Sequence, residues 1–114
     1  MDFTDFFATL REPTPPIRLS PALQALWHDA HGNWGEAHLL VDGAPDADSA
    51  WVHAYLHRKE GDQTNAAYWY GKAGKPVCET SLESEWRTIS DTLLRVVTHR
   101  GKKVRRPTKG DQDL

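Results

Sequence analysis

The sequence predicts an all-α fold, and three observations support this prediction. Apolar residues recur at intervals of three and four along most of the chain, which is the spacing of one helical face. Residues that cap helix N-termini precede these runs, and glycine or proline follows them. A pattern of small and apolar residues also repeats once at an offset of 29 residues. With 114 residues, of which 39% are hydrophobic, the chain is long enough to form one domain with its own core.

The first 16 residues are expected to form a docking segment and a connector. Phe3, Phe6, Phe7 and Leu10 share one helical face. Aromatic rings on so short a helix are costly to leave in water, so this face should pack onto the body of the protein or onto a partner subunit. Residues 13–16 read Pro-Thr-Pro-Pro, which is incompatible with a helix and predicts an extended connector.

Two helix-turn-helix units are predicted to follow. The first begins at Ser20-Pro21, because serine caps free N–H groups and proline tolerates the first helical position, and it turns at Gly32-Asn33. The second begins within residues 46–49 and turns at Gly61-Asp62. The residues expected to face the core are Leu23, Leu26, Trp27, Ala30, Ala37, Leu40, Val41, Ala44, Val52, Tyr55, Leu56, Ala66, Trp69, Tyr70 and Ala73.

A fifth, capping helix is predicted over residues 80–98. Its apolar stripe consists of Leu82, Trp86, Ile89, Leu93, Val96 and Val97. Beyond it the chain is basic and has little to bury, so we expect residues 99–114 to be a disordered basic tail. The predicted organisation is therefore an N-terminal segment (1–16), a helical-repeat domain (17–98) and the tail (99–114).

The internal repeat appears when Gly32 is superposed on Gly61. The matched pairs are Ala25 with Ala54, His28 with His57, Asn33 with Asp62, Ala37 with Ala66, Val41 with Tyr70, and Ala44 with Ala73. Small residues on the second helix of each unit allow the first helix to approach closely. One hairpin cannot bury its apolar face alone, so the repetition predicts that the two units stack on each other.

Residues 61–73, Gly-Asp-Gln-Thr-Asn-Ala-Ala-Tyr-Trp-Tyr-Gly-Lys-Ala, resemble the second-helix segment of tetratricopeptide (TPR) and Sel1-like repeats. The resemblance extends over residues 21–76 and implies a TPR-like module that binds a protein or peptide. Two features depart from the class: the offset of 29 residues is shorter than the usual repeat of about 34, and His28 and His57 stand where the class prefers a bulky aromatic residue. Residues 51–58, taken with Tyr68-Trp69-Tyr70, also resemble a family of small uncharacterised proteins, which implies no activity.

One cluster of residue types points to a metal ion. His53 and His57 are four residues apart and Glu60 follows three later, so the three side chains share one helical face and can approach one cation. His28, His31 and His38 are candidates for further ligands. The sequence lacks the glutamate beside the first histidine that zinc peptidases use as a base. The alternative interpretation is that His28 and His57 are packing residues and that His53 faces solvent or a groove.

A second set of residues predicts a recognition surface. Its members, which combine aromatic rings with arginine and asparagine, are Trp51, Tyr55, Arg58, Asn65, Tyr68 and Trp69. Tyr68, Trp69 and Tyr70 are consecutive and cover most of a helix circumference, so at least one of them should be exposed or line a groove. The alternative is that this ring packs under the N-terminal segment or the fifth helix.

Charge is unevenly distributed along the chain. Residues 1–94 contain 14 acidic and 7 basic residues, whereas residues 95–114 contain 7 basic and 2 acidic. The segment 102–106 (Lys-Lys-Val-Arg-Arg) is the one candidate for contact with nucleic acid, because the acidic body lacks basic residues interleaved with aromatics. The single cysteine and the absence of a basic, apolar leader predict a cytoplasmic protein without disulfides and without a membrane span.

The leading functional hypothesis is a helical-repeat module that binds a protein, a peptide or a second copy of itself, without a cofactor. The alternative is a small metal- or ligand-binding enzyme that uses His53, His57 and Glu60 with a divalent ion. A third possibility is a nucleic-acid accessory protein that acts through its tail. The sequence contains no glycine-rich phosphate loop, nucleophile elbow or zinc-type cysteine spacing, so it predicts no particular reaction.

Overall fold

The computed structural model describes the backbone of residues 1–105 and the side chains of residues 1–95. Within this part of the chain there are six α-helices and no strand, which confirms the predicted all-α class. The helices are α1 (Phe3–Ala8), α2 (Pro21–Ala30), α3 (Trp34–Val41), α4 (Ala47–Glu60), α5 (Gln63–Ala73) and α6 (Leu82–Arg105), with a short 3₁₀ turn, η1 (Thr9–Arg11), after α1.

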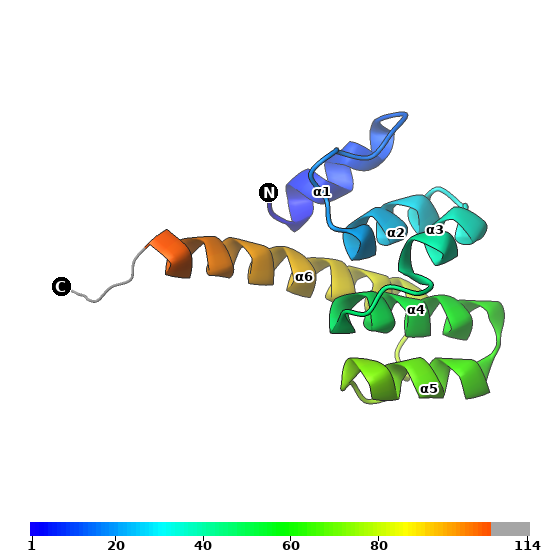
Figure 1. Cartoon of the computed structure of the whole chain (residues 1–114). Coiled ribbons are helices and arrows are strands. Elements are labelled where there is room, and N and C mark those ends of the chain that lie inside the picture. Colours follow the sequence, from blue (N-terminus) through cyan, green and yellow to red (C-terminus); the bar gives the residue numbers. More distant parts are fainter. Residues whose placement is uncertain (106–114) are drawn as a thin grey trace.

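Helix α4 is the centre of the arrangement. It contacts α2, α3, α5 and α6, and Figure 1 shows it between α3 and α5, with α1 and α5 at opposite ends of the molecule. Helices α2 and α3 pair as one hairpin and α4 and α5 as a second. Helix α6 packs on α4, α2 and α1. The face of α4 that carries histidines therefore lies between neighbouring helices.

The two hairpins turn in the same way. The N–H of Asn33 donates to the carbonyl of His28 (3.0 Å), and the N–H of Asp62 donates to the carbonyl of His57 (2.9 Å). The glycines that precede these two residues both have positive φ, 77° and 94°, a conformation that favours glycine. The side chains of Asn33 and Asp62 then cap α3 and α5. The residues matched at the 29-residue offset thus occupy equivalent places in the two turns.

The ends of the helices agree with the sequence in part. Ser20 Oγ accepts a hydrogen bond from the N–H of Leu23 (3.2 Å) and Pro21 is the first helical residue of α2, as predicted. Helix α6 is capped by Ser81, whose Oγ accepts from the N–H of Ser84 (3.0 Å), and not by Thr80. Its backbone continues to Arg105, beyond the predicted end at residue 98. The side chains of the basic segment 102–106 lie outside the described residues.

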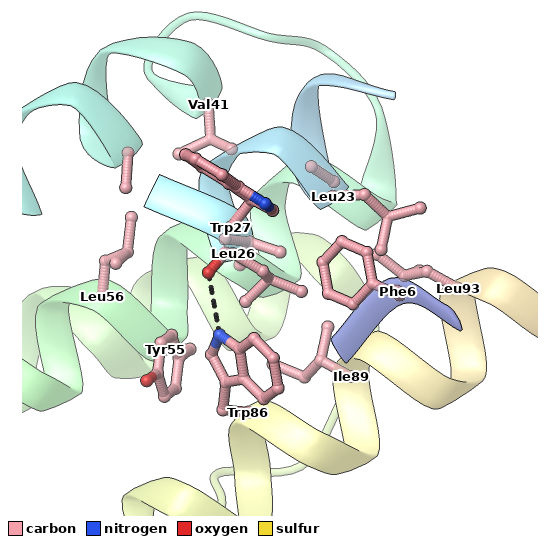
Figure 2. Close-up of a cluster of buried hydrophobic side chains, with 14 of the residues drawn as sticks. Phe6, Leu23, Leu26, Trp27, Val41, Tyr55, Leu56, Trp86, Ile89 and Leu93 are labelled. Carbon is pink, nitrogen blue, oxygen red and sulfur yellow. Dashed lines mark hydrogen bonds between the residues drawn. The ribbon is translucent and has the colours of Figure 1, made fainter. Parts of the chain in front are cut away.

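The core lies where α1, α2, α3, α4 and α6 meet. Phe6 is fully buried and stacks on Trp86, with ring centroids 5.9 Å apart. The indole N–H of Trp86 donates to the carbonyl of Leu26 (2.9 Å), as Figure 2 shows. Phe7, predicted to lie on the same buried face as Phe6, is 51% exposed, and Ala30 is also exposed. Phe6 is thus the buried residue of α1, while Phe3 and Phe7 contact the edge of the same indole.

A buried carboxylate connects α2 to α4. Asp29 is 3% exposed and accepts hydrogen bonds from the hydroxyl of Tyr55 (2.7 Å) and from Nζ of Lys59 (2.9 Å). Burial, with the neighbouring charge of Asp29, raises the pKa of Tyr55, so its hydroxyl keeps its proton and donates. The carboxylate is thus held by two donors from one face of α4.

A second buried carboxylate connects α6 to α4 and α5. Glu85 is 3% exposed and accepts from the hydroxyl of Tyr70 (2.5 Å) and from Nη1 of Arg58 (2.8 Å). Nη2 of Arg58 donates to the carbonyl of Thr80. These contacts fix the start of α6 against the second hairpin.

Candidate functional site

Three histidines from two helices meet beside α4. His38 comes from α3, and His53 and His57 are one turn apart on α4. One ring nitrogen from each histidine lies within 4.8 Å of those of the other two. Nε2 of His38 and Nε2 of His53 are 3.1 Å apart and share a hydrogen bond. The structure thus brings the predicted pair His53 and His57 together with His38; we call these three residues the histidine cluster.

Glu60 occupies a supporting position. Its Oε2 lies 2.7 Å from Nδ1 of His57, the contact expected when an imidazole N–H donates to a carboxylate. In the neutral imidazole, this hydrogen bond places the proton on Nδ1 of His57 and leaves Nε2 with a free lone pair. Glu60 is thus placed to orient His57; it lies outside the group of three histidines but forms a second group of possible ligands with His57 and Asp62.

Two indole rings stack on the histidine cluster. Trp34 is nearly parallel to His38, with centroids 4.8 Å apart, and its N–H donates to the carbonyl of Leu56 (2.8 Å). Trp69 is nearly parallel to His53 at 4.0 Å. These contacts restrict the rotation of both imidazoles, so the ring positions are set by α3, α4 and α5 together.

His53 carries the most unusual environment of the three. It is 2% exposed, and its Nδ1 is buried without a hydrogen-bonding partner among the described residues. Burial, followed by the nearby His38 and His57, lowers the pKa of His53 to about 4, and the carboxylate of Asp42 acts in the opposite direction. His53 is therefore neutral at physiological pH, the protonation state that binds metal ions.

The remaining predicted histidines lie elsewhere. His31 stacks on Trp27 with ring centroids 4.0 Å apart, and His28 contacts the edge of the same indole. His28 and His57 are equivalent in the sequence repeat, but only His57 belongs to the cluster. His38, which supplies the third nitrogen, lies on α3 and bonds to His53 on α4.

The residues of the predicted recognition surface are divided between several environments. Tyr55 is buried and bonded to Asp29, and Arg58 is paired with Glu85. Trp51 is half-buried beneath the Lys75 ammonium group, and Trp69 stacks on His53. Asn65 is exposed at the start of α5, and Tyr68 is 57% exposed with its ring against the edge of Trp69. Asn65 and Tyr68, both on α5, are the exposed members of the set.

Trp34 is a member of the site that the sequence analysis did not single out. It precedes His38 by four residues, and this spacing places the two rings on one face of α3. The same spacing relates His53 to His57 on α4. The spacing indicates which residues share a face of each helix, but not that the two faces meet.

Comparisons with known proteins leave the site to be interpreted from its chemistry. No protein-family model, curated protein or solved structure matches the chain. Within the residues that the structure describes, no helix combines the length and apolar character needed to cross a membrane.

Proposed function

We propose that this protein binds a divalent transition-metal ion through His38, His53 and His57. The observation that carries the proposal is the convergence of three imidazole nitrogens within 4.8 Å of one another. In a tetrahedral zinc site with bonds of about 2.0–2.1 Å, two ligand nitrogens are roughly 3.3 Å apart. The 3.1 Å between Nε2 of His38 and Nε2 of His53 is close to this value.

The contact between Glu60 and His57 supports the same function. Histidines that ligate metals usually donate their other ring N–H to a carboxylate or carbonyl, which fixes the tautomer and raises the basicity of the ligating nitrogen. The 2.7 Å contact between Nδ1 of His57 and Oε2 of Glu60 has this form. Imidazole donors suit zinc, copper, nickel and iron, whereas magnesium and calcium prefer oxygen ligands. The cluster therefore favours the first group of ions.

Zinc titration of the purified, chelator-treated protein tests this function. We expect one ion per chain by calorimetry and a zinc-dependent rise in the thermal unfolding midpoint, because an ion that binds only the folded state stabilises it. His38→Gln removes one ligand at a half-buried position and should abolish both effects. His31→Gln, outside the cluster, is the matched control and should bind zinc like the wild type. Absence of stoichiometric zinc, copper or nickel binding by the wild-type protein would contradict the proposal.

A second candidate function is protein or peptide recognition by a TPR-like module. Two features favour it: the two hairpins share their turn geometry at the 29-residue offset, and α5 presents a half-exposed tyrosine, Tyr68, beside Trp69. In helical repeats the next unit or a ligand packs against such an outer face. Here Tyr68 lies on the face of α5 directed away from α4.

For this second function, Tyr68→Ala is the informative variant. We expect it to weaken self-association measured by analytical ultracentrifugation, or the capture of a partner cross-linked in cells, while the helical circular dichroism stays unchanged. Truncation of an aromatic interface residue commonly costs about 1–2 kcal/mol or more of binding free energy. Thr64→Ala, an exposed position one turn earlier on α5, serves as the control. Equal association of both variants and the wild type would argue against recognition through α5.

A further inference from the structure

We propose that Asp42 supplies the fourth ligand and completes a metal site of three histidines and one aspartate. This inference rests on the proposed metal-binding function and identifies a residue that the sequence analysis did not consider. The site then consists of two pairs with the same spacing: His38 on α3 with Asp42, the residue that follows the last residue of α3, and His53 with His57 on α4. Residues four apart on a helix project from the same face.

The backbone places Asp42 in register with His38. Asp42 is the residue that ends α3, and its N–H donates to the carbonyl of His38 (2.8 Å), the hydrogen bond of a regular helical turn. Its φ of −68° keeps Cβ where a helical residue would place it, whereas its ψ of 121° is extended and takes the following chain out of the helix. The side chain thus starts from the same face of α3 as the imidazole of His38.

The side chain of Asp42 is free to move toward the cluster. It is exposed, and among the described residues its carboxylate takes part in no hydrogen bond or ion pair. Its oxygens are outside the group of atoms that lie within 4.8 Å of one another, so coordination requires rotation of this side chain.

The other acidic residues near the cluster have different roles. Glu60 is occupied by Nδ1 of His57. Asp62, which has a carboxylate oxygen within 4.8 Å of His57 and Glu60, caps α5 by accepting from the N–H of Asn65 (3.1 Å). Three neutral imidazoles leave the full charge of a divalent ion uncompensated in a largely buried place, which is costly. A carboxylate ligand from Asp42 reduces that net charge to one and closes a tetrahedral sphere of the kind that zinc adopts.

Zinc affinity and cobalt spectroscopy test the assignment. We expect Asp42→Asn to weaken zinc binding by at least roughly tenfold, and Asp48→Asn, an exposed acid in the first turn of α4, to leave it unchanged. In Asp42→Cys loaded with Co²⁺ we expect a thiolate-to-cobalt charge-transfer band in the near ultraviolet, which requires direct coordination at position 42. Wild type and Asp48→Cys, which both retain Cys78, should lack this band.

The possible failures are distinguishable. If the wild-type protein binds zinc, Asp42→Asn binds it within about threefold of the wild type, and Asp42→Cys shows no charge-transfer band, the Asp42 assignment is wrong and the histidine site stands. If the wild type binds no zinc, copper or nickel, both the proposed function and this inference are overturned. Circular dichroism of each variant before titration distinguishes the loss of a ligand from the loss of the fold. The charge-transfer band of Asp42→Cys reports coordination at position 42 directly.

Discussion

Replacing Arg58 with methionine is expected to lower the free energy of unfolding by roughly 3–5 kcal/mol, because it leaves a buried carboxylate without its cation. The guanidinium side chain is 13% exposed and that of Glu85 only 3%. In Arg58→Met, Glu85 keeps one donor, the hydroxyl of Tyr70, and loses the positive charge. Urea unfolding followed by circular dichroism measures the change.

A double variant separates the cost of the unpaired charge from the value of the ion pair. In Arg58→Met/Glu85→Gln the amide oxygen still accepts from Tyr70, and no charge remains buried. We therefore expect the double variant to recover more than half of the lost stability, since buried ion pairs are often replaceable by neutral groups. Lys72→Met, which removes an exposed cation on α5, should stay within about 0.5 kcal/mol of wild type. A double variant no more stable than Arg58→Met would contradict this account of Glu85.

The helices were largely predictable because their ends depend on local chemistry. Ser20 with Pro21, and the glycines followed by Asn33 and Asp62, act within a few residues of themselves, so the sequence contains all that is needed to place them. The end of α6 was not predicted, because glycine and basic residues weaken a helix without marking a single terminus. The choice of Ser81 over Thr80 as its cap is likewise not marked by residue type, since both side chains are suitable.

The candidate site was predictable only within one helix. His53 and His57 share a face of α4 by spacing, and the prediction joined them on that basis. The addition of His38 depends on how α3 packs against α4, which is a contact between hairpins and is not encoded in any local pattern. The residues of the predicted recognition surface lie in several different environments for a related reason. Tyr55 and Arg58 are directed at Asp29 and Glu85, buried acids that have no distinguishing signature in the sequence.

The metal-free protein is expected to lose roughly 3 kcal/mol of stability through His53 as the pH falls from about 6.5 to about 4. Burial and the neighbouring histidines lower the pKa of His53 from 6.5 to about 4 in the folded state. Between these values the unfolded chain binds the proton and the folded chain does not, so the free energy of unfolding decreases with decreasing pH. Above the pKa of His53 in the unfolded chain, no stability is lost through this residue. Below its pKa in the folded protein, the loss is complete and does not increase further.

The hydrogen bond between His38 and His53 gives a physical reason why the folded protein becomes less stable as the pH falls. Two Nε2 atoms 3.1 Å apart hold one proton between them, and full protonation of both rings would direct two N–H groups at each other.

Urea unfolding in chelator at a series of pH values measures the effect in wild type and in His53→Gln. The variant should lack the additional loss, whereas His31→Gln, whose imidazole is exposed on Trp27, should retain it. Equal acid sensitivity in wild type and His53→Gln would mean that His53 is protonated in the folded protein as readily as in the unfolded chain, and the packing of the cluster would then not exclude the charge.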